Sequence, residues 1–158
     1  MEGQILGFNG ANLAWQNAPG AARVVDSTGQ LVGPLVAVNL PAALRKVGDF
    51  TFAIQVVPDG FPDNGALLYS YTSHDCSGTQ YLRLGRTQLI TPSRQSGTVL
   101  EYVTGPFEMV TINSYETSYP GTPRFCINIP SKDTGIYGRG ATIDLSTLGL
   151  VPPFHLEF

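Results

Sequence analysis

Charged residues are scarce in this chain. Among its 158 residues, nine are Lys or Arg and twelve are Asp or Glu, so charged residues make up 13% of the chain and the net charge is −3. The basic residues stand singly except for the neighbours Arg45 and Lys46, so no basic stripe is available to neutralise a series of phosphates. We therefore expect no nucleic-acid partner.

Long hydrophobic runs are absent too. No run reaches the roughly 18 apolar residues of a membrane-spanning helix, so no membrane span is predicted. Met1–Gln4 lack the basic and apolar segments of a signal peptide, and none is expected in this chain. Helical periodicity does not extend over more than about ten residues anywhere, which argues against strands that alternate with helices.

The usual signatures of catalysis and cofactor binding are missing. The chain has no Gly-x-Ser-x-Gly elbow, phosphate loop or dinucleotide fingerprint. The loop that holds Asp59, Asp63 and Asn64 lacks EF-hand spacing, so an ordinary loop is favoured over a weak calcium site. His74 and His155 belong to no ligand motif. We expect a non-enzymatic protein with no catalytic residues, no metal and no cofactor.

Glycine and proline are plentiful, with 18 and 12 residues, and the chain is also rich in threonine and tyrosine. This composition suits many short strands joined by tight turns. Asp49–Val57 shows the clearest strand pattern, because Phe50, Phe52, Ile54 and Val56 alternate onto one face. The predicted fold class is all-β, an antiparallel sandwich or jelly-roll-like barrel of about ten short strands.

Several local features refine this prediction. A hairpin is expected around Gly29, which would adopt positive φ, and Pro34 marks its second strand as an edge strand or as the site of a bulge. Residues 42–45 are expected to form one helical turn after Pro41. Residues 98–103 and 107–113 are expected to pair as a hairpin across Thr104–Pro106. We divide the chain into an N-terminal arm, residues 1–20, and a single β-domain, residues 21–158.

The two cysteines, Cys76 and Cys126, are 50 positions apart and form no Cys-x-x-Cys pair. A disulfide between them is favoured over two buried thiols, because the surrounding composition looks extracellular. Catalysis by His74, Asp75 and Cys76 is disfavoured, since neighbours on a strand point to opposite faces and Cys76 would be used in the disulfide. We expect Asp75 to cap a polar turn instead.

Aromatic residues provide the best candidates for ligand binding. Tyr115 and Tyr119 bracket a polar turn, and exposed tyrosines suit both sugars and protein surfaces. Packing of these tyrosines against their own strands is the alternative. Trp15 stands alone in the lead-in and would be buried against its own core, a neighbouring subunit or a ligand. Glu101 and Glu108 flank the predicted hairpin, where solvated rim residues are favoured over a glycosidase pair.

Three stretches, Val24–Gly33, Tyr69–Thr79 and Asp144–Phe154, together resemble a β-rich domain of uncharacterised bacterial proteins. Some of those proteins are secreted, and some carry the domain after collagen-like Gly-X-Y repeats, which this chain lacks. The resemblance covers about residue 22 to the C-terminus. It implies an extracellular setting, and it supplies no established activity and no catalytic residues.

We therefore expect a non-enzymatic domain at an extracellular, cell-surface or virion-surface location that serves assembly or attachment. The apolar lead-in and the tail Phe154–Phe158 favour a homo-oligomer, for instance a trimer. The alternative is a carbohydrate-binding module that uses Trp15, Tyr115 and Tyr119. The expected partners are thus further copies of the chain, a glycan or a protein surface.

Overall fold

The protein is all-β in its described part, as the sequence predicts. The computed structural model describes residues 4–8, 13–17, 22–37, 41–84, 90–118 and 122–158, the first two segments as backbone only. These residues hold no α-helix. They form one 3₁₀ turn, η1 (Leu145–Leu148), and twelve strands: β1 (Gln4–Phe8), β2 (Leu13–Asn17), β3 (Arg23–Val25), β4 (Leu31–Ala37), β5 (Ala42–Val47), β6 (Phe50–Gln55), β7 (Leu67–Tyr71), β8 (Tyr81–Leu82), β9 (Ser93–Ser96), β10 (Val99–Ser118), β11 (Phe125–Asp144) and β12 (His155–Glu157).

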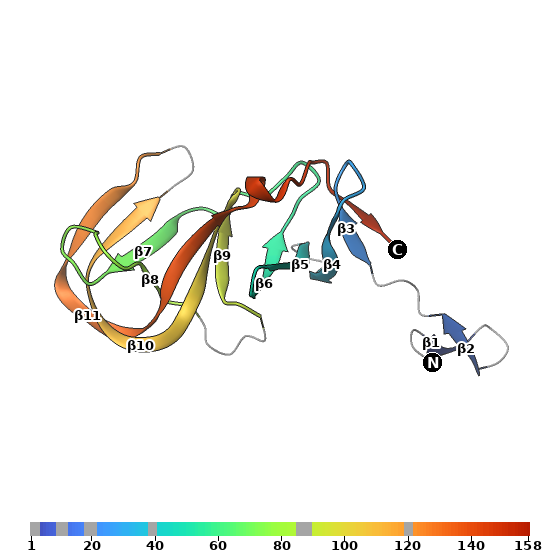
Figure 1. The fold of residues 1–158 in the computed structure, drawn as a ribbon, viewed down its shortest axis with the longest axis horizontal. Coiled ribbons are helices and arrows are strands. Elements are labelled where there is room, and N and C mark those ends of the chain that lie inside the picture. Colours follow the sequence, from blue (N-terminus) through green and yellow to red (C-terminus); the bar gives the residue numbers. More distant parts are fainter. Residues whose placement is uncertain (1–3, 9–12, 18–21, 38–40, 85–89, 119–121) are drawn as a thin grey trace.

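Four strands close into a ring. The first five-stranded sheet has the order β11-β8-β7-β10-β9, and β10 also pairs with β11, so that β7, β8, β10 and β11 surround a common interior. We call these four strands the ring; Figure 1 shows it at one end of the molecule. All of its pairings are antiparallel. Its two long members, β10 and β11, have 20 residues each, longer than the short strands predicted.

The second five-stranded sheet has the order β12-β3-β4-β5-β6, and we call it the meander sheet. Its β5 and β6 pair in continuous register from Ala42 and Gln55 to Val47 and Phe50. The helical turn expected at residues 42–45 is therefore wrong, because strand pairing on both sides of β5 overrides the local preference. Gly29 has φ of 82° as predicted, and Pro34 lies between register shifts, which fits the predicted bulge.

An apolar core joins the meander sheet to the first residues of β10. Phe52, Ile54 and Val56 are buried here, as their alternation predicts, and Phe52 packs edge-on against Tyr102 with ring centroids 5.0 Å apart. The buried members of this core are Val24, Val32, Ala43, Phe52, Ile54, Val56, Leu100, Leu145, Leu150 and Phe154. The two sheets also meet where the Gln95 amide pairs with the backbone of Gln55 through two hydrogen bonds of 2.8 and 2.9 Å.

Asp26 ties the first hairpin to the C-terminal segment. Its side chain is fully buried and accepts hydrogen bonds from the Thr28 hydroxyl and from the backbone N–H groups of Thr28, Gln30 and Val151, at 2.7 to 2.9 Å. Burial alone would raise the pKa of Asp26, but these hydrogen bonds lower it to about 2. The carboxylate thereby brings the segment before β12 alongside β3.

The hairpin expected across Thr104–Pro106 is wrong, because these residues lie inside the continuous strand β10. The register with β11 shifts between Val103 and Phe107, and this irregularity accommodates the proline, which has no N–H to donate. Gly138 of β11 pairs with Phe107 beside this irregularity, and a Cβ added to Gly138 would come within 2.4 Å of the Val103 side chain. Glycine at position 138 therefore leaves the space that the Val103 side chain fills.

The N-terminal strands β1 and β2 form an antiparallel hairpin that pairs only with itself in the described residues. Residues 4–8 and 13–17 thus pair as strands where an irregular lead-in was expected, and the connecting residues 9–12 lie outside the described part. No helix in the described residues is long and apolar enough to cross a membrane.

Candidate functional site

A groove of about 450 Å³ lies where β7, β10 and β11 meet on the ring. Apolar side chains and two tyrosine rings share it with charged groups. The lining residues are Leu68, Ser70, Arg83, Ile112, Tyr115, Ile129, Ser131, Lys132, Asp133 and Tyr137. Concave sites of this size, largely apolar with a few fixed polar groups, are typical of small-molecule binding.

An irregular stretch of β11 builds one wall of the groove. Ile112 pairs with Asp133 and Ser114 pairs with Asn128, so the four residues 129–132 lie opposite Asn113 alone. This long bulge carries Lys132 to the rim of the groove, where the side chain is exposed. Bulges commonly redirect side chains in this way beside binding sites.

Tyr137, Asp133 and Arg83 form a connected polar set in the groove. The Tyr137 hydroxyl donates a hydrogen bond of 2.7 Å to Oδ2 of Asp133, and NH1 of Arg83 lies 3.6 Å from the same oxygen. The Arg83 guanidinium also lies 5.8 Å from the centre of the Tyr137 ring. Burial, followed by the hydrogen bond to Asp133, raises the pKa of Tyr137. Tyr137 therefore remains a neutral donor, and its ring position is fixed.

Tyr115, predicted as a ligand-binding residue, is half-buried and lines this groove. Tyr115 pairs with Ser70 of β7 on one side and with Ile127 of β11 on the other. Its ring can therefore both pack against these strands and contact a ligand. Tyr119 lies outside the described residues. Trp15 belongs to β2, and its side chain also lies outside the described part. The structure thus places one of the three predicted aromatics in a site.

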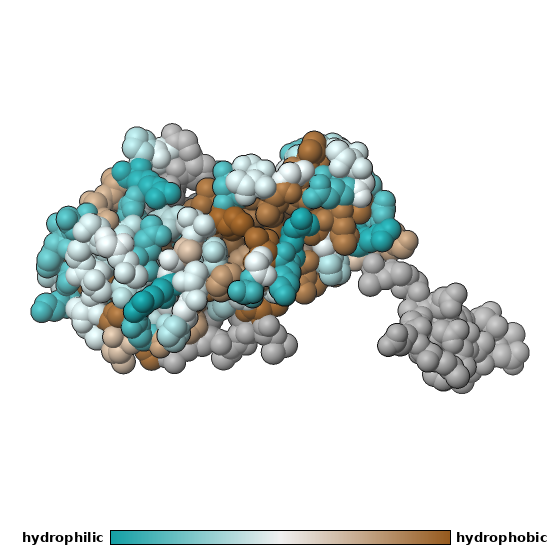
Figure 2. Space-filling model, in the orientation of Figure 1, coloured by the Kyte–Doolittle hydropathy of each residue, from teal (hydrophilic) through white to brown (hydrophobic). Residues whose placement is uncertain are grey.

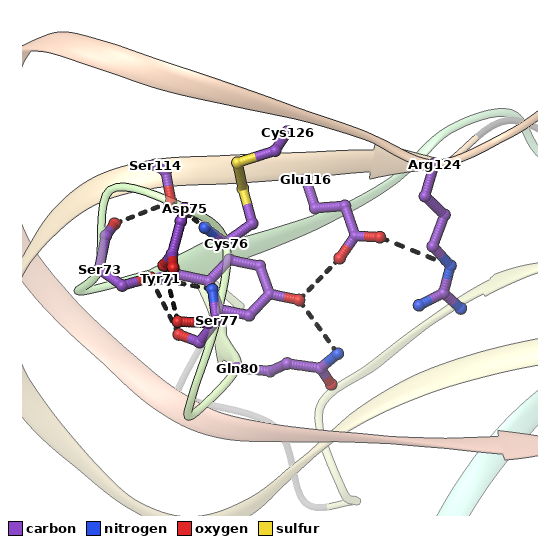
Figure 3. The surroundings of a disulfide bond; sticks show 10 residues. All are labelled: Tyr71, Ser73, Asp75, Cys76, Ser77, Gln80, Ser114, Glu116, Arg124 and Cys126. Atoms are coloured by element: carbon purple, nitrogen blue, oxygen red, sulfur yellow. Dashed lines mark hydrogen bonds and ion pairs between the residues drawn. A yellow bond between two sulfur atoms is a disulfide. The ribbon is translucent and has the colours of Figure 1, made fainter.

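The predicted disulfide between Cys76 and Cys126 is present, with the two Cα atoms 5.8 Å apart. It joins the loop after β7 to β11 (Figure 3). The Ser114 hydroxyl bridges the same loop to β10, since it accepts from the N–H of Cys76 at 3.1 Å and donates to the carbonyl of Ser73 at 2.8 Å. Within this loop Asp75 accepts a hydrogen bond from the Ser77 hydroxyl.

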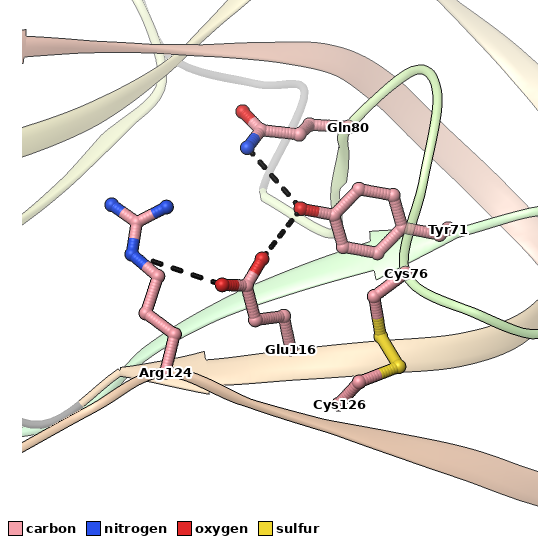
Figure 4. Close-up of polar contacts among 6 residues, drawn as sticks. All are labelled: Tyr71, Cys76, Gln80, Glu116, Arg124 and Cys126. Carbon is pink, nitrogen blue, oxygen red and sulfur yellow. Dashed lines mark hydrogen bonds and ion pairs between the residues drawn. A yellow bond between two sulfur atoms is a disulfide. The ribbon is translucent and has the colours of Figure 1, made fainter.

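Polar side chains cluster inside the ring beside the disulfide (Figure 4). The Tyr71 hydroxyl donates to Oε2 of Glu116 at 2.8 Å and accepts from the Gln80 amide at 3.2 Å. Arg124 lies 3.8 Å from Oε1 of Glu116, and its guanidinium is 5.2 Å from the centre of the Tyr69 ring. Burial, followed by the hydrogen bond to Glu116, raises the pKa of Tyr71.

Glu101 is fully buried, so the prediction that it is a solvated rim residue is wrong. Neither its carboxylate oxygens nor the nearby Tyr69 hydroxyl makes a hydrogen bond of good geometry in the described structure. Burial raises the pKa of Glu101 to about 7, against the opposing effects of Arg94, Tyr69 and Arg124. Burial, followed by the charge of Glu101, also raises the pKa of Tyr69.

Glu101 and Glu108 do not form the carboxylate pair of a glycosidase. Glu108 is half-buried and accepts from Nε of Arg139 at 3.0 Å, whereas Glu101 faces the ring interior. Both lie on β10, and seven residues at about 3.3 Å each separate them by roughly 20 Å. A retaining or inverting pair requires about 5 to 9.5 Å.

The acidic loop considered for calcium has a different role. Oδ1 of Asp63 accepts from the N–H of Gly65 at 3.1 Å and from the Ser96 hydroxyl at 2.8 Å, so the carboxylate holds its own loop against β9. Within the described ranges, no three His, Cys, Asp or Glu residues come together as metal ligands. The hydrogen bonds of Asp63 therefore give this loop a structural role.

Sequence reasoning missed four functional candidates, Arg83, Lys132, Asp133 and Tyr137. One signal was available, because Pro130 interrupts an otherwise alternating strand and a proline inside a strand often marks a bulge. The pairing of β11 with β10 over a shifted register could not be read from this signal alone.

No family model, no curated protein and no solved structure matches this chain.

Proposed function

We propose that this protein is a non-enzymatic attachment domain that binds a carbohydrate in the groove between β7, β10 and β11. The observation that carries this proposal is the half-buried ring of Tyr115 beside charged groups in one concave site, with the buried Tyr137 as part of its wall. A sugar ring presents apolar C–H faces and polar hydroxyl groups. A groove with an apolar floor and a polar rim complements both kinds of surface.

An extracellular or particle-surface location supports the same function. A disulfide persists in oxidising compartments and is rare in the cytosol. The low charge and the strand-and-turn composition fit such a setting, and so does the resemblance to β-rich bacterial domains, some of them secreted. An attachment domain at a surface would meet glycans there.

Self-assembly is the second candidate function, and exposed apolar residues favour it. Figure 2 shows apolar surface over the meander sheet. Val36, Leu156 and Phe158 are 52%, 44% and 86% exposed. Light scattering at high protein concentration tests this candidate: a trimer or another oligomer supports it, and a monomer at every concentration contradicts it.

A glycan array followed by calorimetry tests carbohydrate binding. We expect wild-type protein to bind at least one class of saccharide, and Tyr115→Ala to weaken that binding by about tenfold or more. Phe125→Ala is the matched control, because Phe125 is an aromatic residue of β11 that is 48% exposed and lies outside the groove. An array without hits, or equal affinities for wild type and Tyr115→Ala, would contradict the proposal.

A further inference from the structure

The charge of the groove narrows the class of sugar that it can hold. Arg83 and Lys132 contribute two positive charges and Asp133 contributes one negative charge, so the groove is positive in a protein whose net charge is −3. A uniformly negative rim would repel acidic ligands. This local excess of positive charge attracts them instead.

The carboxylate that lines the groove, that of Asp133, already has a hydrogen-bond donor and a positive charge beside it within the protein. Oδ2 of Asp133 receives the Tyr137 hydroxyl at 2.7 Å and lies 3.6 Å from NH1 of Arg83. Asp133 therefore orients Tyr137 and Arg83, and it leaves one positive charge without an internal counterpart. That charge is on Lys132.

Lys132 forms no ion pair in the described part of the chain. It is exposed, lies on the bulge of β11, and lines the same groove as Tyr115 and Tyr137. A ligand seated against Tyr115 in this groove would bring its substituents within reach of the Lys132 ammonium group, which is a compact point charge on a flexible stem.

We infer that the groove selects a saccharide with a single negative charge, such as a uronic acid or a sugar sulfate ester, and that Lys132 binds the anionic group. A ligand with one negative charge would bring the net charge of the groove to zero. A doubly charged phosphate ester would exceed that balance and would meet the carboxylate of Asp133. This inference rests on the proposed function, because it assigns the ligand class of the same site.

The test compares three methyl glycosides by calorimetry at low salt: glucose, glucuronic acid and glucose 6-sulfate. We expect at least one of the two acidic glycosides to bind about tenfold more tightly than the neutral glycoside, and the comparison between them identifies the anionic group. The preference should shrink as salt is added, because an exposed ion pair is screened.

The two lysines of the chain, Lys46 and Lys132, supply a matched pair of variants. Lys132→Gln should remove most of the acidic preference, whereas Lys46→Gln, an exposed position on β5, should leave it unchanged. Equal or tighter binding of the neutral glycoside, or an acidic preference that survives Lys132→Gln, overturns this inference and leaves the proposed function standing. Binding of none of the three glycosides, together with an empty array, overturns both.

Discussion

Two buried carboxylates distinguish the two halves of this molecule. Asp26, in the meander sheet, and Glu101, in the ring, are both fully shielded from solvent. Asp26 accepts four hydrogen bonds and its pKa falls to about 2, whereas Glu101 makes none of good geometry and its pKa rises to about 7. Burial alone does not decide the charge of a carboxyl group; the supply of donors does.

The core at the meander sheet and the interior of the ring also differ in their polarity. The core cluster on the meander sheet is apolar, and the buried carboxylate of Asp26 beside it is fully hydrogen-bonded. The ring interior instead mixes apolar residues with Tyr69, Tyr71, Glu101 and Glu116, and a disulfide links its loop to β11. We infer that hydrophobic burial stabilises the meander sheet, and that covalent and polar links carry more of the stability of the ring.

The largest effect is expected in the apolar core. Phe52→Ala removes a ring that is 1% exposed and should destabilise the protein by about 4 kcal/mol, because the cavity adds to the lost burial. Urea unfolding measures this change. Val36→Ala in the same sheet, at a position that is 52% exposed, should change stability by less than about 0.5 kcal/mol. A similar loss for both variants would show that the meander sheet does not depend on its buried core.

The next largest effect is expected for loss of the disulfide. Its removal should destabilise the protein by about 3 kcal/mol, because the bond closes a long loop and limits the conformations of the unfolded state. The variant Cys76→Ser with Cys126→Ser removes it, and added reductant should then have no further effect. Hydrogen exchange should quicken first at ring amides and later at amides of the meander sheet. Uniform loss of protection in both halves would contradict the division of stability proposed above.

Glu101→Gln should stabilise the protein at pH 8 by up to about 3 kcal/mol, because an amide imitates the neutral acid and avoids a buried charge. The raised pKa of Glu101 means that its contribution is full below about pH 4.5 and is lost as the pH rises through about 7. Wild type and variant should therefore converge near pH 4. Parallel stability curves from pH 4 to pH 8 would show that Glu101 titrates normally.

Asp26 provides the corresponding test at acid pH. Its lowered pKa means that its contribution is present above about pH 4 and is lost as the pH falls through about 2. Asp26→Asn should thus flatten the acid limb of the stability curve, while Glu101→Gln flattens the limb between about pH 4.5 and 7. A curve in which either variant flattens the other limb would reverse the assignment.

The smallest effect is expected for Tyr71→Phe, which removes the hydroxyl shared by Glu116 and Gln80. The loss should be about 1 kcal/mol, since Arg124 still accompanies Glu116 and the ring still fills its place. Thermal unfolding at pH 7 measures it. A loss as large as that of Phe52→Ala would indicate that the polar cluster, rather than the disulfide, holds the ring together.

Much of the fold could be predicted from local signals. Alternation identified the buried face of Asp49–Val57, Gly29 marked its turn, and the two cysteines formed the favoured pair. The burial of Glu101 could also have been predicted, because it alternates with Val99 and Val103 on a face that is otherwise apolar. The charge of Glu101 favoured a position at the surface, whereas the apolar residues that alternate with it predicted its burial correctly.

The rest depended on contacts that no local pattern contains. Thr104–Pro106 has the composition of a turn, yet long-range pairing with β11 carries the strand through it. The role of Gly138 becomes visible only once the Val103 side chain is seen to pack against it. The groove depends on the register shift that sets Lys132 and Asp133 beside Tyr137, so only Tyr115 could be named as one of its residues beforehand.

We propose that the ring carries the binding function and that the meander sheet supports it. Titration of the isotope-labelled protein with a methyl glucuronide, followed by amide NMR shifts, tests this division of roles. We predict saturable shifts confined to the neighbourhood of Tyr115, Lys132 and Tyr137. Shifts clustered on β3, β4 or β12 would contradict binding at the ring, and so would an unchanged spectrum at high ligand concentration.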